Sequence, residues 1–246
     1  MQGKVVLVTG ANQGIGKASA VALGKLGARL VLACRNTEKG RAAVADLRRE
    51  GAQDVELLVG DLGSQSDVRR LASEFKAKYD RLDVLKASAP SRVVSVSSEA
   101  HRRARMRWDD LEFKAGPYSA FAAYGQSKLA NILFTRELAR RLEGTRVTAN
   151  CLHPGVVASG FGHTYGGVVS AVLRVASPFL IAPEKGARTS VFLASSPEVE
   201  GVSGKYFDKC RERRPSAEAL AEGAPERLWA ISEERTGLRV TPSAAA

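Results

Sequence analysis

Several residue types are scarce in this chain of 246 residues, and each scarcity excludes a class of protein. Three cysteines, Cys34, Cys151 and Cys210, are too few and odd in number for a fully paired disulfide framework. The three histidines have no metal-ligand spacing among themselves or with the cysteines, so no metal site is expected. No run of about 18 apolar residues occurs, so no transmembrane helix is expected either.

The cysteines and the N-terminus also bear on location. Cys34 and Cys151 lie in apolar runs that predict strands, so buried, reduced thiols are the expected state. The chain enters its first apolar run at Val5, with no signal peptide before it. We therefore expect a cytoplasmic protein, with peripheral attachment to a membrane surface as the alternative.

Basic residues exceed acidic ones, 37 Lys+Arg against 26 Asp+Glu, for a formal net charge of +11. Such a surplus favours anionic ligands, which include phosphates, anionic lipid and nucleic acid. Arginines cluster in residues 102–107 and 211–214, and we interpret both clusters as solvated loops because no nucleic-acid-binding module accompanies them. The mostly apolar stretch 168–182 predicts a lid over an apolar substrate, a membrane contact or a partly buried helix.

Short apolar runs alternate with segments of helical spacing, which predicts an α/β fold. We expect a single doubly wound Rossmann-type domain, with a mostly parallel sheet, over residues 1–246, structured from 3 to 238 and ending in a loose tail at 239–246. The expected strands are residues 5–8, 29–33, 55–59, 82–85, 92–96, 147–152 and 205–207, and the expected helices are 17–26, 38–50, 67–78, 124–142 and 184–194.

One connection does not fit this fold. Only six residues, 86–91, separate the strands expected at 82–85 and 92–96. Adjacent parallel strands need a crossover of about a dozen residues or more, usually a helix. Either these strands are not parallel neighbours, or one strand-helix crossover is missing from the chain.

A glycine-rich loop, Thr-Gly-Ala-Asn-Gln-Gly-Ile-Gly at residues 9–16, follows the first strand and opens the first helix. Glycines there allow a tight turn and let the backbone approach a pyrophosphate at the helix N-terminus. The alternative is a turn that binds nothing, but the placement after the first strand favours a binding role. The candidate cofactor-binding residues of this loop are Gly10, Asn12, Gln13, Gly14, Ile15 and Gly16.

Arg35 follows the second strand and bears on the choice of cofactor. An NAD site usually has a carboxylate at this position for the ribose 2′-hydroxyl, whereas an arginine accommodates a 2′-phosphate. Arg35 therefore predicts NADP(H), with an ordinary exposed arginine as the alternative. Asp61, followed by Leu62, comes after the third strand and is placed to meet the adenine, although a turn or helix-capping role is nearly as well supported.

Tyr124 and Lys128 are four residues apart and share one helix face. A lysine ammonium stabilises a phenolate, which lets a tyrosine exchange a proton with a carbonyl or an alcohol. Ser97 and Ser98 end the strand that precedes this helix, so a serine hydroxyl there can hold the reacting oxygen beside the phenol. Turn chemistry is the equally weighted alternative for the two serines.

Together these features resemble the short-chain dehydrogenase/reductase family and its retinol-dehydrogenase-like branch. The resemblance extends from about Gly3 to Leu238. The motifs that carry it are Thr9-Gly10-xxx-Gly14-Ile15-Gly16, Asp61-Leu62, Val94-Ser95-Val96-Ser97-Ser98, Tyr124-xxx-Lys128, Ser127-Lys128-Leu129-Ala130-Asn131, His153-Pro154-Gly155-Val156-Val157 and Ser203-Gly204-Lys205-Tyr206-Phe207.

The resemblance implies an NADP(H)-dependent oxidoreductase that interconverts an alcohol and a carbonyl. It implies a small apolar substrate, such as a retinoid, a lipid aldehyde or a xenobiotic carbonyl. By the same resemblance, Tyr124 is the acid/base, Lys128 binds the nicotinamide ribose and assists Tyr124, and Ser98 orients the carbonyl. Val157 and Ser159 would approach the nicotinamide.

The chain departs from the family after the strand expected at 82–85. The family has Asn-Asn-Ala-Gly there and then a long helix with a catalytic asparagine, whereas Lys86-Ala87-Ser88-Ala89-Pro90 follows here. The missing helix would normally contribute to the dimer interface, so the family's usual homo-oligomer is in doubt for this chain. The alternative function is therefore a shortened, catalytically impaired member that acts only as a nucleotide- or partner-binding protein.

Overall fold

The computed structural model describes residues 1–79, 90–155 and 181–239. The strand expected at 82–85, most of the apolar stretch 168–182 and nearly all of the tail lie outside these residues. In chain order the elements are β1 (Val5–Thr9), α1 (Gly14–Lys25), β2 (Arg29–Cys34), α2 (Thr37–Arg49), β3 (Val55–Val59), α3 (Gln65–Lys78), β4 (Ser91–Val96), η1 (Glu99–Arg103), α4 (Ala120–Arg141), β5 (Val147–His153), α6 (Pro183–Ser195), η4 (Pro197–Val199), β6 (Tyr206–Asp208), β7 (Arg211–Arg213), α7 (Ala217–Leu220) and α8 (Ala224–Thr236).

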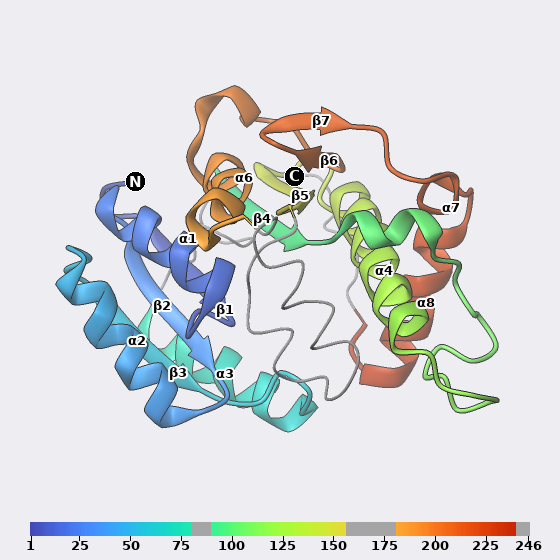
Figure 1. Ribbon diagram of the computed structural model, residues 1–246, viewed down its shortest axis with the longest axis horizontal. Coiled ribbons are helices and arrows are strands. Elements are labelled where there is room, and N and C mark those ends of the chain that lie inside the picture. Colours follow the sequence, from blue (N-terminus) through green and yellow to red (C-terminus); the bar gives the residue numbers. More distant parts are fainter. Residues whose placement is uncertain (80–89, 156–180, 240–246) are drawn as a thin grey trace.

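Strands β1, β2 and β3 form a parallel sheet in the N-terminal half, with Val5 opposite Arg29 and Leu30 opposite Val55. Successive residues of a strand point to opposite faces, and both faces are apolar here. One face packs against α1 and α2, and the other against α3 (Figure 1). The sheet is therefore buried on both faces, as a doubly wound fold requires.

Strands β4, β5 and β6 form a second parallel sheet, and β7 joins it antiparallel to β6. Cys151 faces Leu129, Ile132 and Leu133 of α4, whereas Leu152, the next residue, belongs to the cluster of Leu193 on α6. Because this alternation buries both faces, α4 and α6 cover opposite sides of β5.

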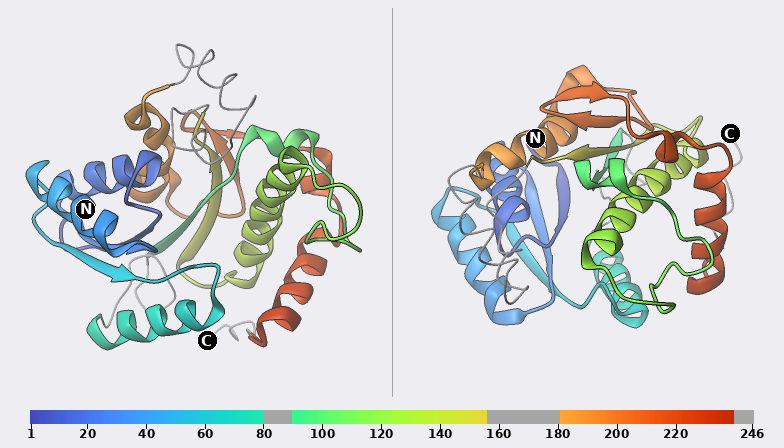
Figure 2. Two further views of the ribbon diagram at one scale, coloured as in Figure 1. Left: turned by 60° about the horizontal axis from the view of Figure 1, so that its bottom comes forward. Right: turned by 45° about the vertical axis from the view of Figure 1, so that its right-hand side comes forward.

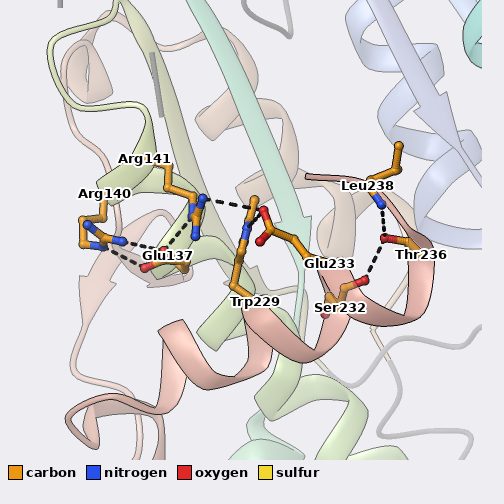
Figure 3. Close-up of polar contacts among 8 residues, drawn as sticks. All are labelled: Glu137, Arg140, Arg141, Trp229, Ser232, Glu233, Thr236 and Leu238. Atoms are coloured by element: carbon orange, nitrogen blue, oxygen red, sulfur yellow. Dashed lines mark hydrogen bonds and ion pairs between the residues drawn. The ribbon is translucent and has the colours of Figure 1, made fainter. Parts of the chain in front are cut away.

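Helix α8 packs along α4, as Figure 3 shows. Glu137 is fully buried and accepts hydrogen bonds from Arg140 Nε at 2.8 Å and Arg141 Nε at 2.7 Å. The Arg141 guanidinium lies 4.5 Å from the ring centroid of Trp229, whose indole N–H donates to Glu233 at 2.8 Å. Burial opposes charge on Glu137, but the two arginines hold its pKa below the usual value. This ionic and aromatic network holds the C-terminal helix in place.

The single sheet that the sequence predicts is divided in two within the described residues. No strand pairing joins β1 to β4 there, so each is the end strand of its own sheet. Helices α1 and α6 pack along each other and so join the two sheets. The two sheets, each with its helices, lie side by side in the views of Figure 2. The strand expected between them, residues 82–85, lies outside the described residues.

Some element boundaries differ from the predicted ones, and some elements were not predicted. Helix α4 begins at Ala120 rather than at Tyr124, because the Ser119 hydroxyl accepts the Ala122 N–H and caps it. Tyr124 therefore lies in the second turn, not at the start of the helix. The sequence interpretation also missed β7, α7 and α8. No helix within the described ranges is long and apolar enough to cross a membrane.

Candidate active site

The three glycines of the loop after β1 meet two physical requirements, positive φ at Gly10 and Gly14 and a close backbone approach at Gly16. Gly10 and Gly14 have φ of +64° and +55°, a region that favours glycine. A Cβ on Gly16 would lie 2.4 Å from the Gly10 carbonyl oxygen, closer than real side-chain atoms come. The loop therefore folds tightly against the first turn of α1.

The N-terminus of α1 is open toward an anion. Gln13 occupies the capping position without a side-chain cap, and the first turn carries no acidic residue. The backbone N–H groups of a helix's first turn have no partner within the helix, and together with the helix dipole they favour a negative charge there. The residues present thus fit a dinucleotide pyrophosphate, which Gly10, Asn12, Gln13, Gly14, Ile15 and Gly16 would hold.

Cys34, the last residue of β2, packs against this glycine-rich loop, a role that the sequence did not indicate. It is 3% exposed, and the backbone N–H groups of Ala11 and Asn12 lie near its sulfur. Burial raises the pKa of the thiol, and the two N–H groups oppose that shift. Cys34 and Cys151 are both buried and form no disulfide within the described residues.

Arg35 and Asp61 meet at the ends of β2 and β3. The Arg35 guanidinium lies 3.8 Å from an Asp61 carboxylate oxygen, and its side chain is 79% exposed. Such an exposed ion pair contributes only about 0–1 kcal/mol, so the guanidinium can pair with another anion at little cost. Asp61 also accepts the Gly63 N–H at 2.9 Å, which is the turn role considered for it. Leu62 beside it is 51% exposed.

The two serines after β4 have different roles. Ser97 is 1% exposed, and its hydroxyl donates to the Lys128 carbonyl at 2.7 Å, so it ties the strand to α4. The Ser98 hydroxyl instead accepts the Ala100 N–H at 3.3 Å as the cap of η1. That bond occupies a lone pair and leaves the Ser98 hydroxyl proton to donate to another group. Ser98 is therefore the serine whose hydroxyl is available for a ligand.

Tyr124 and Lys128 lie together on α4. The Lys128 ammonium is 5.5 Å from the Tyr124 ring centroid and donates to the Val96 carbonyl at 3.3 Å. Asn131, one turn further, donates to the same carbonyl at 2.9 Å. Burial lowers the pKa of Lys128 below its usual value. Because burial also reduces screening by water, the charged ammonium acts more strongly on the Tyr124 phenol. Val157 and Ser159, the other predicted site residues, lie outside the described residues.

The fold is of the doubly wound α/β class, and comparison with known proteins shows an oxidoreductase family. The family model described as short chain dehydrogenase matches residues 4–111 and 113–166. The chain belongs to this family.

Curated relatives match nearly the whole chain. Human retinol dehydrogenase 14 is 40% identical over 295 residues, covering 97% of this chain and 88% of the relative. Human retinol dehydrogenase 13 is 38% identical over 282 residues, covering 96% and 84%. Because this chain has 246 residues, at least 49 of the 295 aligned positions of retinol dehydrogenase 14 have no counterpart here.

Solved structures share the fold. An uncharacterised protein from Mycobacterium paratuberculosis is 27% identical with a TM-score of 0.73, covering 96% of this chain and 94% of that one. RhlG of Pseudomonas aeruginosa, solved with NADP in its active site, is 21% identical with a TM-score of 0.67, covering 89% and 98%. The latter likeness concerns the fold alone.

Proposed function

We propose that this protein is an NADP(H)-dependent oxidoreductase that interconverts an alcohol and a carbonyl on a small apolar substrate. The observation that carries the proposal is the placement of the Lys128 ammonium 5.5 Å from the Tyr124 ring centroid. Both side chains lie on α4. Ser97, the residue before Ser98, joins this helix to the end of β4 through its bond to the Lys128 carbonyl.

Each residue has a definite task in this reaction. The cofactor, when bound, exchanges a hydride with the substrate carbon. Ser98 donates its free hydroxyl proton to the substrate oxygen and orients it, because its oxygen is already held by the Ala100 N–H. Tyr124 gives a proton to that oxygen in reduction and takes it back in oxidation. Lys128 stabilises the phenolate and contacts the nicotinamide ribose.

The choice of NADP(H) rests on Arg35. Its guanidinium is exposed and forms a weak ion pair with Asp61, and a 2′-phosphate can replace that partner. Asp61 and Leu62 would lie beside the adenine, and Val157 and Ser159 near the nicotinamide. RhlG and an actinorhodin polyketide ketoreductase, which share the fold, were solved with NADP and NADPH, and this supports the same choice here.

The names of the relatives support a retinoid or another apolar aldehyde or alcohol as the substrate. An apolar substrate of this kind partitions into lipid, so peripheral contact with a membrane is the alternative to a free cytoplasmic enzyme. Residues 1–246 form one binding and catalytic domain, and no nucleic-acid partner is needed.

A strand-helix crossover is absent from the chain between Leu85 and Lys86. Its absence lowers turnover and destabilises the homo-oligomer that is usual for the family. Two observations support this: the six-residue connection and the unmatched positions of retinol dehydrogenase 14. An intact mass above 26.2 kDa by several kilodaltons would show that the protein contains more residues than the sequence here. If the mass agrees, inserting a family-like strand-helix segment at this junction should raise turnover and sharpen the melting transition.

The activity test compares the parent with Tyr124→Phe, which removes the transferable proton with little change of shape. The parent should oxidise NADPH in the presence of an apolar aldehyde, such as retinal. Tyr124→Phe should lose at least about a hundredfold in turnover while it still binds NADPH. Ordinary turnover by Tyr124→Phe would exclude this mechanism.

A further inference from the structure

His101 is fully buried, three residues after Ser98, and both of its ring nitrogens are engaged. Nδ1 lies 2.6 Å from the Ser98 carbonyl oxygen, and Nε2 lies 3.1 Å from the backbone nitrogen of Ser216. A backbone N–H can only donate, so Nε2 must be an acceptor without a proton. Nδ1 must then carry the proton of the neutral ring, and it donates to the Ser98 carbonyl.

This contact belongs to a larger attachment of η1 to the C-terminal part of the chain. The Tyr206 hydroxyl donates to Glu99 at 2.9 Å, and the Tyr206 ring meets His101 edge-on at 5.0 Å between centroids. Arg102 donates to Glu99 at 2.7 Å and to the Arg214 carbonyl at 2.9 Å. The turn that begins at Ser98 is thus fastened to β6 and to the segment ahead of α7.

We propose that His101 is a positioning residue, which holds Ser98 in its catalytic orientation by bridging the Ser98 carbonyl and the Ser216 N–H. The inference rests on the proposed function, in which the Ser98 hydroxyl orients the substrate oxygen. That hydroxyl is held by Ala100 within the same turn, so a shift of the Ser98 backbone moves the hydroxyl as well. A misplacement of about 1 Å at such a group costs about a hundredfold in rate.

The bridge works only with a neutral imidazole. A protonated ring would turn a second N–H toward the Ser216 N–H, and two donors cannot pair. Burial lowers the pKa of His101, and the Ser98 carbonyl opposes that shift; of the charged groups nearby, Arg102 and His153 lower the pKa and Glu99 raises it. The neighbouring Tyr206 hydroxyl is engaged with Glu99. The neutral form that the bridge needs is therefore the favoured one near neutral pH.

Substitutions at His101 separate positioning from packing. His101→Phe fills the space without hydrogen bonds, whereas His101→Asn offers an amide N–H near the place of Nδ1–H. His101→Phe should lower kcat by roughly tenfold to a hundredfold with little change in the KM for NADPH. His101→Asn keeps the bond to the Ser98 carbonyl but loses the one to Ser216, so it should restore part of the rate. An unchanged kcat in His101→Phe, or an equal loss in His101→Asn, would overturn the proposal.

The Ser216 end of the bridge has its own matched pair. Ser216 has φ of −66°, which proline also adopts, so Ser216→Pro removes the N–H donor at a φ that proline allows. Ser216→Ala is the control, because it removes the same hydroxyl cap to Ala219 but keeps the N–H. Ser216→Pro should lower kcat further than Ser216→Ala does, and equal rates in the two variants would overturn the bridge.

A spectrum of the full-length protein separates failure of this inference from failure of the proposed function. Nitrogen-15 NMR of the histidine rings, with the His101 signals assigned through His101→Asn, reports the tautomer without any turnover. Signals of a neutral Nδ1–H ring near neutral pH support the bridge even if the parent reduces no carbonyl. An Nε2–H ring or an imidazolium overturns it even if the parent is active.

Discussion

Substitution of Gly16 by alanine tests the cofactor loop most sharply. The new Cβ would lie 2.4 Å from the Gly10 carbonyl oxygen and 2.9 Å from its carbon, and both atoms are backbone. A backbone carbonyl cannot rotate away as a side chain can, so the loop itself must move. Overpacking of this kind costs about 1–3 kcal/mol, and the better helix propensity of alanine offsets about 1 kcal/mol of it. The net loss of stability should therefore be small.

The larger effect of Gly16→Ala should appear in cofactor binding, because the displaced Gly10 belongs to the loop that holds the pyrophosphate. A loss of about 1.4 kcal/mol in binding free energy raises the dissociation constant tenfold, and we expect at least that for NADPH by fluorescence titration. Gly24→Ala is the stability control, since it overpacks the same helix with its new Cβ 2.4 Å from the Ala52 Cβ and lies outside the cofactor loop. If Gly16→Ala binds NADPH as tightly as the parent, the assignment of the loop is wrong.

Three further predictions concern other parts of the molecule. Arg35→Asp should weaken NADPH binding about tenfold to a hundredfold and favour NADH, because a charge-assisted bond to the 2′-phosphate is lost; equal affinities of the parent for the two cofactors would refute this. Glu137→Gln should lower the free energy of unfolding in urea by about 2 kcal/mol, since it removes a buried charge that two arginines share; an unchanged midpoint would refute this. His101 and His153 have pKa values lowered by burial, so the unfolded chain takes up protons first as pH falls below about 6.5. Stability should then fall by up to about 1.4 kcal/mol per pH unit for each histidine, and less steeply in His101→Asn; equal slopes in the two proteins would contradict the shift at His101.

The elements with strong local signals were predicted well. Strand β3 has the predicted bounds, because an apolar run there is ended by Gly60. Strand β7 has the sequence Arg-Glu-Arg and all three residues are exposed, so no apolar pattern marks it. It exists because the chain turns through Lys209 and Cys210 with positive φ and pairs with β6. Such pairing is a tertiary effect that a local pattern does not contain.

The candidate site shows the same division between local and tertiary information. The spacing of Tyr124 and Lys128 follows from helix geometry, so the sequence could place them together. The residues themselves did not separate Ser97 from Ser98, and only the family resemblance assigned the catalytic role to Ser98. The difference depends on the burial of Ser97 against α4, which is a property of the packed structure. The support from Cys34 and His101 likewise depends on segments far apart in the chain.

The transfer of deuterium from C4-deuterated NADPH to an apolar aldehyde tests the central claim most directly. Mass spectrometry of the product detects even slow turnover and shows which carbon received the label. The account predicts deuterium on the alcohol carbon with the parent, and at least about a hundredfold slower labelling with Tyr124→Phe at unchanged NADPH affinity. No labelling by either the parent or the variant with an inserted strand-helix segment, when both bind NADPH, would contradict it.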